Sequence, residues 1–132
     1  MNNDALMSKT RRLPERNKVK TADTWDLSSL FPDDAAWEKA FKRLEGRIAG
    51  FARFKGKFSQ DAKTLAACLK YDCDTDRLAE RVAIYAFLKA AEDQADSHYQ
   101  GMVGRFQNVA TRLGQAASFI RPEILAISAS KT

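Results

Sequence analysis

Apolar residues recur three and four positions apart through most of this chain, and this spacing constrains its fold more than any other feature. After Trp37 the apolar side chains alternate steps of four and three, at Phe41, Leu44, Ile48 and Phe51. A longer run has the same spacing: Tyr99, Met102, Phe106, Val109, Leu113, Ala116 and Ile120. This spacing places the side chains along one face of an α-helix. No useful run alternates apolar and polar residues, so we predict an all-α fold.

The helix-start and helix-stop signals predict about four helices, arranged as antiparallel hairpins in a bundle. Asp33 or Asp34 would cap the first helix. Ser59 would cap a short second helix over residues 60–71, with Ala62, Leu65 and Leu69 buried. Residues 72–75 would form a turn before the third helix.

The third helix would carry two apolar stripes and therefore lie at the centre of the bundle. Its first stripe is Leu78, Val82, Tyr85 and Leu88, and its second is Ile84, Phe87 and Ala91. The acidic run 92–96 would turn the chain, and Asp96 or Ser97 would cap the fourth helix. Pro122 would end that helix, because a proline disfavours helical geometry in the residue before it. Residues 123–127 could start a further helix.

The chain carries a net charge of +5, and the excess is concentrated near its N-terminus. Between residues 8 and 21 only Glu15 opposes a set of basic side chains: Lys9, Arg11, Arg12, Arg16, Lys18 and Lys20. We expect a flexible basic tail over residues 1–22 and one helical domain over 23–132. The tail could contact phosphate groups, but no aromatic residue interleaves with it as in single-strand binders. Nucleic acid is therefore the less favoured partner.

The apolar runs and the two cysteines predict a cytoplasmic protein with reduced thiols. No run approaches the roughly 20 apolar residues that span a bilayer, so no membrane partner is expected. The N-terminus lacks the apolar segment of a secretory signal. Cys68 and Cys73 would point to different faces of a helix, which disfavours a disulfide. They could form half of a metal site, but no second pair accompanies them.

Three segments, in order along the chain, resemble the oligoendopeptidase F family of thimet-type zinc metallopeptidases. They are TWDLSSLF (24–31) with Trp37, YAFLKAAED (85–93) and SFIRPEIL (118–125). The resemblance implies the N-terminal helical domain of such a peptidase, which forms part of the wall of the substrate channel. It also implies a catalytic domain as partner, short peptides as substrate, and truncation before that domain. Members of the family bind zinc through His-Glu-x-x-His and a later Glu.

The positions of this chain that match the family motifs are structural. None of them corresponds to a catalytic, metal-binding or cofactor-binding residue of the family. His98 is its only histidine, so the zinc motif has no counterpart and we expect the chain alone to be inactive. The structural positions include the packed entrance to the helices and, at residues 122 and 123, the joint towards the catalytic domain. They are Trp25, Leu27, Phe31, Trp37, Tyr85, Asp93, Pro122 and Glu123.

Two further features have competing interpretations. We interpret His98 as a surface residue capped by Asp96, in preference to a metal ligand grouped with nearby carboxylates. Gly101 and Gly104 would mark a close approach of helices or a late start of the fourth helix.

The alternative to a peptidase domain is a stand-alone helical module that binds protein or, through its tail, nucleic acid. A domain severed from an enzyme should expose an apolar surface and self-associate through it.

Overall fold

The computed structural model of the protein describes residues 27–130, and every regular element within that range is helical. The elements are α2 (Asp34–Gly50), the short 3-10 helix η3 (Phe51–Phe54), α3 (Ala62–Glu92), α4 (Ser97–Ala117) and α5 (Ile120–Ser130). The predicted all-α class is therefore confirmed. Trp25 and the predicted basic tail over residues 1–22 lie outside the described residues, and the predicted domain boundary at residue 23 stays a prediction.

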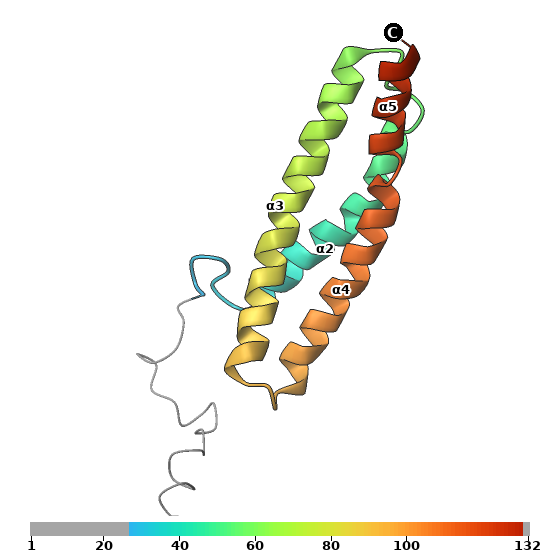
Figure 1. Cartoon of the computed structure of the whole chain (residues 1–132). Coiled ribbons are helices and arrows are strands. Elements are labelled where there is room, and N and C mark those ends of the chain that lie inside the picture. The colour runs from blue at the N-terminus through green and yellow to red at the C-terminus, as the bar shows by residue number, and fades with distance from the viewer. Residues whose placement is uncertain (1–26, 131–132) are drawn as a thin grey trace, which may run out of the picture.

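The long helices α3 and α4 form an antiparallel hairpin, and α2 packs across one side of it (Figure 1). Helix α5 continues beyond α4 at the end of the hairpin where η3 also lies. None of the described helices combines the length and the apolar character needed to cross a membrane.

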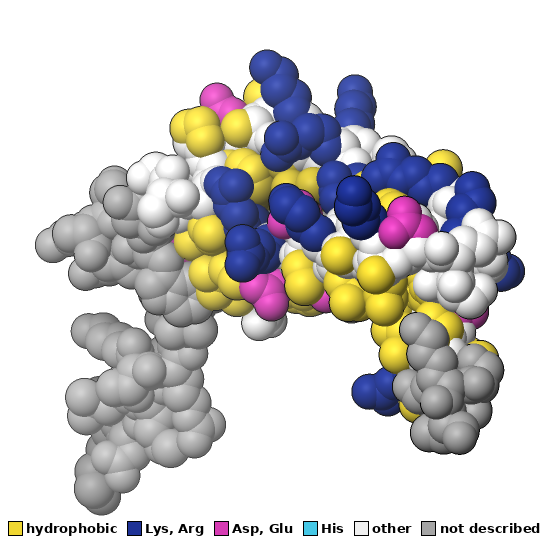
Figure 2. All heavy atoms as spheres, turned by 90° about the horizontal axis from the view of Figure 1, so that it is seen from above, with side chains coloured by type: hydrophobic (Ala, Val, Ile, Leu, Met, Phe, Trp, Pro, Cys, Tyr) yellow, Lys and Arg dark blue, Asp and Glu magenta, His cyan; other side chains and the backbone are white. Residues whose placement is uncertain are grey.

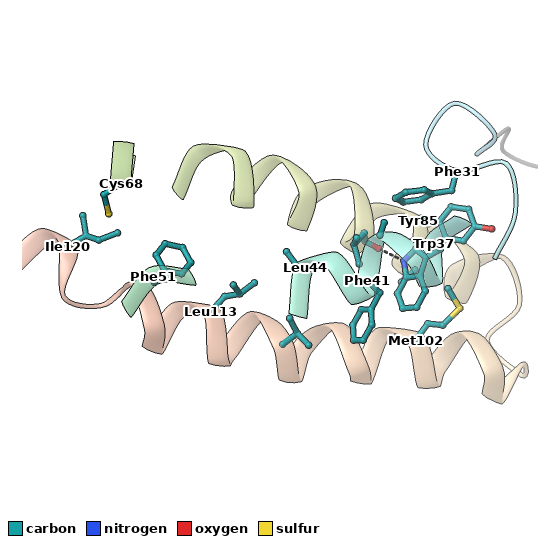
Figure 3. Close-up of a cluster of buried hydrophobic side chains, with 14 of the residues drawn as sticks. Phe31, Trp37, Phe41, Leu44, Phe51, Cys68, Tyr85, Met102, Leu113 and Ile120 are labelled. Carbon is teal, nitrogen blue, oxygen red and sulfur yellow. Dashed lines mark hydrogen bonds between the residues drawn. The ribbon is translucent and has the colours of Figure 1, made fainter. Parts of the chain in front are cut away.

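The core lies where α2 meets the α3–α4 hairpin (Figure 3). Trp37 is fully buried, stacks on Phe41 with 5.0 Å between ring centroids, and donates its indole N–H to the carbonyl oxygen of Val82 at 2.9 Å. Leu44 and Met102 are buried beside this pair. Truncating a buried aromatic residue such as Trp37 to alanine typically costs about 3–5 kcal/mol. The apolar stripe predicted for the first helix is thus the side of α2 that packs into the core.

Aspartates cap the starts of three helices. The carboxylate of Asp33 accepts a hydrogen bond from Ala36 N at 2.8 Å, and that of Asp96 accepts one from His98 N at 2.9 Å. Both caps were predicted, as was the chain reversal between Glu92 and Ser97. Helix α3 is capped by Asp61 through Lys63 N at 2.9 Å, so the predicted cap at Ser59 is wrong. Both serine and aspartate can accept a hydrogen bond from a backbone N–H at a helix start. The backbone leaves the helix at Asp61, and this residue therefore becomes the cap.

The predicted turn over residues 72–75 is also wrong, because α3 runs through it without interruption. Thr75 is buried, and its hydroxyl donates to the carbonyl oxygen of Tyr71 at 2.7 Å, one helical turn earlier. The same hydroxyl oxygen accepts a hydrogen bond from Arg47 Nε of α2 at 2.5 Å. A tertiary contact therefore stabilises helical geometry in a segment whose composition favours a turn.

The predicted burial along α3 was only partly right. Val82 and Tyr85 are buried, but Ala62 and Leu69 are exposed and Leu65 is half-buried. Helix α3 has partners in α2 and α4, yet its second apolar stripe, which includes Ile84 and Phe87, remains exposed. Neither α2 nor α4 covers the stripe fully, although the Phe87 ring contacts Phe106 of α4.

The predicted fourth helix is split into α4 and α5 by a turn at residues 118–119. Ser118 N–H bonds to the carbonyl oxygen of Gln115 at 3.3 Å and closes α4. Pro122 then lies in the first turn of α5, where its missing N–H would have no partner within the helix. The prediction that Pro122 ends the helix is therefore wrong: the break comes at residues 118–119, and Arg121, the residue before the proline, is already helical because α5 begins at Ile120.

The close approach expected at Gly101 and Gly104 is absent, since a Cβ at either position would meet nothing within 4 Å. Helix α4 also begins before both, so a late start does not explain them. The close approach is at Gly50 instead, where a Cβ would lie 2.0 Å from the hydroxyl oxygen of Tyr71.

Candidate functional site

All three segments that carry the family resemblance contribute side chains to the buried core, and the first two contact each other there. Phe31, from the first segment, is buried and packs edge-on against Tyr85, from the second, with 5.5 Å between ring centroids. Leu27 is buried nearby in the same core cluster as Trp37. Leu27, Phe31 and Trp37 thus belong to one hydrophobic cluster, and their role as the packed entrance stays a prediction. Trp25, its remaining member, lies outside the described residues.

Asp34, at the start of α2, joins three side chains from the other two long helices. Its carboxylate accepts hydrogen bonds from the Tyr85 hydroxyl at 2.6 Å and from the Tyr99 hydroxyl at 3.1 Å. His98 Nε2 lies 3.4 Å from the same carboxylate. The network ties α2 to both α3 and α4 at one end of the bundle. From the sequence, Asp34 was predicted only as a possible helix cap, because side chains from three helices come together only on folding.

The two tyrosines of this network are held in their protonated, donating form. Burial first, and then the hydrogen bond to Asp34, raises the pKa of Tyr85 well above its usual range. The same two causes raise the pKa of Tyr99 to about 12. A phenol with so high a pKa is a hydrogen-bond donor at neutral pH and cannot serve as a base. The network therefore has the properties of a structural clamp.

His98 lies where the sequence analysis placed it, exposed in the first turn of α4 and capped by Asp96. The predicted surface interpretation is confirmed, with Asp34 as an additional neighbour. No group of three or more His, Cys, Asp or Glu side chains within residues 27–130 is arranged to hold a metal ion. The described residues therefore do not fit the zinc that the family resemblance implies, and no chemistry through a metal follows from them.

The two cysteines have different surroundings, as predicted from their spacing. Cys68 is buried and Cys73 is exposed, and both thiols are free. Burial raises the pKa of the Cys68 thiol, so it behaves as a small packed side chain.

A second link between α2 and α4 joins Glu38 to Arg105. The guanidinium donates two hydrogen bonds to the carboxylate, at 2.6 and 2.8 Å, and lies 4.5 Å from the centroid of the Phe41 ring. The hydrogen bond from Arg105 lowers the pKa of Glu38, and burial opposes this effect. A bidentate pair over an aromatic ring has a fixed geometry, so it sets the position of α4 relative to α2.

The predicted joint at residues 122 and 123 contacts the loop after η3. Glu123 Oε1 accepts a hydrogen bond from the backbone N–H of Gly56 at 2.6 Å. Gly56 has a φ of 79°, a conformation that glycine adopts at low cost. An open pocket of about 270 Å³ lies beside this contact, lined by Gly56, Phe58, Ser59, Glu123, Ala126 and Ile127. Pro122 is exposed, and Asp93 lies in the turn after α3, where it accepts a hydrogen bond from Ala95 N at 3.2 Å.

The most strongly charged feature is a groove between α2 and α3, which we call the arginine groove. Its volume is about 580 Å³, and it is lined by Arg43, Arg47, Asp74, Arg77, Leu78 and Arg81. Figure 2 shows Lys and Arg side chains gathered over the upper part of one view of the molecule, with hydrophobic side chains along its lower edge. The sequence contained a signal for the groove: one pair of arginines four residues apart on each helix, which places each pair on one helix face.

Arg47 is fixed at the edge of this groove by α3. Its Nε and Nη2 donate to the Thr75 hydroxyl and to the Tyr71 carbonyl oxygen, the latter at 3.1 Å. The guanidinium also lies 4.0 Å from the centroid of the Tyr71 ring, and the Tyr71 hydroxyl donates to the carbonyl oxygen of Arg47 at 2.8 Å. These reciprocal contacts hold the guanidinium in one position.

Large apolar side chains remain exposed on α3 and α5. Ile84 and Phe87 are 45% and 43% exposed, and Phe87 packs edge-on against Phe106 of α4 with 6.1 Å between ring centroids. Leu69, further along α3, is 41% exposed, and Leu125 on α5 is 62% exposed. Clusters of exposed apolar side chains mark interaction surfaces more often than single ones do. The pair Ile84 and Phe87 is the clearest such feature here.

Comparison with known proteins finds relatives among bacterial oligopeptidases. The chain is 34% identical to oligopeptidase PepF of Bacillus subtilis over 123 residues, which are 93% of this chain and 18% of that protein. It is 26% identical to group B oligopeptidase PepB of Streptococcus agalactiae over 115 residues, or 87% of this chain and 19% of that protein. It is 26% identical to the chromosomal oligoendopeptidase F of Lactococcus lactis over 111 residues, or 83% of this chain and 18% of that protein.

Two other comparisons add no information: no protein-family model and no solved structure matches this chain. The chain spans a little under a fifth of the length of the curated relatives it matches, whereas the match covers most of the chain itself. The resemblance read from three short segments therefore extends over nearly the whole sequence. This chain belongs to the oligoendopeptidase F family.

Proposed function

We propose that this chain forms the N-terminal helical domain of an oligoendopeptidase F-type zinc metallopeptidase that hydrolyses short peptides in the cytoplasm. In this role it would form part of the wall of the substrate channel. The observation that carries the proposal is the match itself, which covers 93% of this chain and only 18% of the Bacillus subtilis oligopeptidase. A segment of that size corresponds to one domain of the relative.

The exposed apolar side chains support a partner that covers them. Ile84 and Phe87 are exposed on α3 three residues apart, and Leu125 adds an exposed apolar side chain on α5. We assign this surface to the contact with the catalytic domain. In the isolated chain the same surface should lead to self-association.

The proposal also states that the 132-residue chain does not hydrolyse peptides by itself. The described residues contain no set of zinc ligands, and the phenols of Tyr85 and Tyr99 are held protonated. The test is an assay of the purified chain on a mixture of short peptides, with and without added zinc. Hydrolysis that a zinc chelator abolishes would contradict this part of the proposal.

The domain assignment is tested in a chimera. The matched segment of the Bacillus subtilis oligopeptidase is replaced by the 123 residues of this chain that align with it, and peptide hydrolysis is measured. We expect the chimera to retain activity and a deletion of the same segment to lose it. A matched chimera with Phe87→Ser and Ile84→Ser should dock poorly and lose activity. A folded, zinc-loaded chimera without activity would refute the assignment.

A further inference from the structure

The arginine groove carries more positive charge than the surrounding fold requires. Arg43 and Arg47 are one turn apart on α2, and Arg77 and Arg81 are one turn apart on α3. Among residues 27–130, Asp74 is the only acidic residue that lines the groove, and its carboxylate is paired with Lys70 at 2.9 Å. Like charges one helical turn apart destabilise a helix, so each pair carries a cost in stability.

Two of these arginines are held by the protein and two are available. Arg47 is fixed by Thr75 and Tyr71, and Arg81 donates to the carbonyl oxygen of Leu30 at 2.7 Å. Arg43 and Arg77 are exposed and have no hydrogen bond or ion pair within residues 27–130. Their guanidinium groups each retain a full set of N–H donors in the fork geometry that matches a carboxylate. The groove is therefore a partly preorganised site for more than one anionic group.

We propose that the arginine groove binds the carboxylates of acidic peptides, with Arg43 and Arg77 as the main ligands. The choice of a peptide rests on the proposed function. The geometry favours carboxylates over single-stranded nucleic acid, which needs free aromatic faces for base stacking. The ring of Tyr71, which contacts a groove arginine, has the guanidinium groups of Arg47 and Arg53 at 4.0 and 4.7 Å from its centroid. Its stacking surface is therefore occupied.

The probe is a short glutamate-rich peptide with blocked ends, titrated calorimetrically into the full chain at low and at moderate salt. A glutamine-rich peptide of the same length is the neutral control. We expect binding of the glutamate peptide that weakens as salt rises, and no binding of the glutamine peptide. Because residues 1–22 are also basic, binding by the wild-type chain does not by itself locate the site.

Two double variants locate it. Arg43→Gln with Arg77→Gln removes the available arginines, and Arg112→Gln with Arg121→Gln removes the same charge from exposed positions on α4 and α5 that do not line the groove. We expect the first variant to weaken binding by roughly tenfold and the second to change it less than about twofold. Circular dichroism checks that both variants retain the helical fold. An Arg43→Lys and Arg77→Lys variant keeps the charge but lacks the fork, and should bind with an intermediate affinity.

Equal weakening by the two glutamine variants would overturn the proposal, because it would show a response to net charge alone. No binding of the glutamate peptide at low salt would also overturn it. An oligonucleotide or inorganic phosphate that binds through Arg43 and Arg77 while the peptide does not would replace the carboxylate assignment. None of these results would touch the domain assignment, since the activity of the chimera tests that separately.

Discussion

Replacement of Gly50 by alanine should destabilise this protein, although alanine is the better helix former. Gly50 is the last residue of α2 and has a φ of −65°, which alanine adopts readily. In a helix the change would by itself stabilise the protein by roughly 0.5–1 kcal/mol. A Cβ at this position, however, would lie 2.0 Å from the hydroxyl oxygen and 2.7 Å from Cζ of Tyr71. The Tyr71 ring must therefore move.

Moving Tyr71 disrupts the contacts that fix Arg47. The Tyr71 hydroxyl would lose its 2.8 Å hydrogen bond to the carbonyl oxygen of Arg47, worth about 1 kcal/mol. The ring would also lose its place under the Arg47 guanidinium, now 4.0 Å from its centroid, at a cost of about 0.5–1 kcal/mol. Overpacking typically adds about 1–3 kcal/mol. After the gain in helix propensity is subtracted, the net loss in the free energy of unfolding should be about 1.5–4.5 kcal/mol.

The assay is urea unfolding followed by circular dichroism, with Gly46→Ala as the matched control. Gly46 is one turn earlier in α2, and a Cβ there would meet nothing within 4 Å, so its replacement should stabilise the protein by about 0.5–1 kcal/mol. In a Tyr71→Leu background the cost of Gly50→Ala should largely disappear, which a double-mutant cycle measures. If Gly50→Ala stabilises the wild-type chain as much as Gly46→Ala does, the reasoning is refuted.

Three further predictions follow from the polar links and the exposed face. Because the pKa of Tyr99 is raised from 10.0 to about 12, the free energy of unfolding should fall as pH rises through this window, where only the unfolded chain loses the proton. In the Asp34→Asn variant, ultraviolet titration should show that the Tyr99 phenol ionises at a lower pH, and the free energy of unfolding should fall less over this pH range. A tyrosine titration curve identical to that of the wild type would contradict this prediction. Because Arg105 lowers the pKa of Glu38, that carboxylate stabilises the fold above pH 4.5, and its contribution is lost as pH decreases from there through the lowered pKa. Glu38→Gln should cost about 0.5–1 kcal/mol at neutral pH and reduce the acid dependence of unfolding, and acid unfolding identical to wild type would argue against it. Phe87→Ser should decrease self-association in light scattering with a stability loss below about 1.5 kcal/mol, since the ring is 43% exposed; unchanged association would exclude this face.

Local signals predicted much of the fold. The caps at Asp33 and Asp96 could be predicted because a side chain that accepts a hydrogen bond from a backbone N–H two or three residues ahead needs no tertiary partner. The chain reversal after Glu92 and the stripe from Trp37 to Phe51 follow from local composition and periodicity. The turn predicted over residues 72–75 failed for the opposite reason. The helical geometry of this segment is supported by a hydrogen bond from Arg47, which is 28 positions away from Thr75 in the sequence.

The candidate sites were predicted less well than the helices. The pairing of arginines four apart is visible in the sequence, but nothing in it shows that the pair on α2 faces the pair on α3. The convergence of Tyr85, Tyr99 and His98 on Asp34 likewise joins positions 51 to 65 residues apart. The family motifs indicated the relatives of this chain and its proposed function. They did not predict the arginine groove or the contacts of Asp34.

By itself, then, the sequence determined the helical class, the starts of α2 and α4, the end of α3 and the family relationship, because apolar periodicity, caps and short motifs are local properties of the chain. Only the tertiary structure decided that residues 62–92 form one helix, that Gly50 and not Gly101 lies against a neighbour, and that four arginines line one groove. Each of these outcomes depends on the distance between side chains from different helices. That distance is set by how α2 packs against the α3–α4 hairpin, and no single segment encodes it.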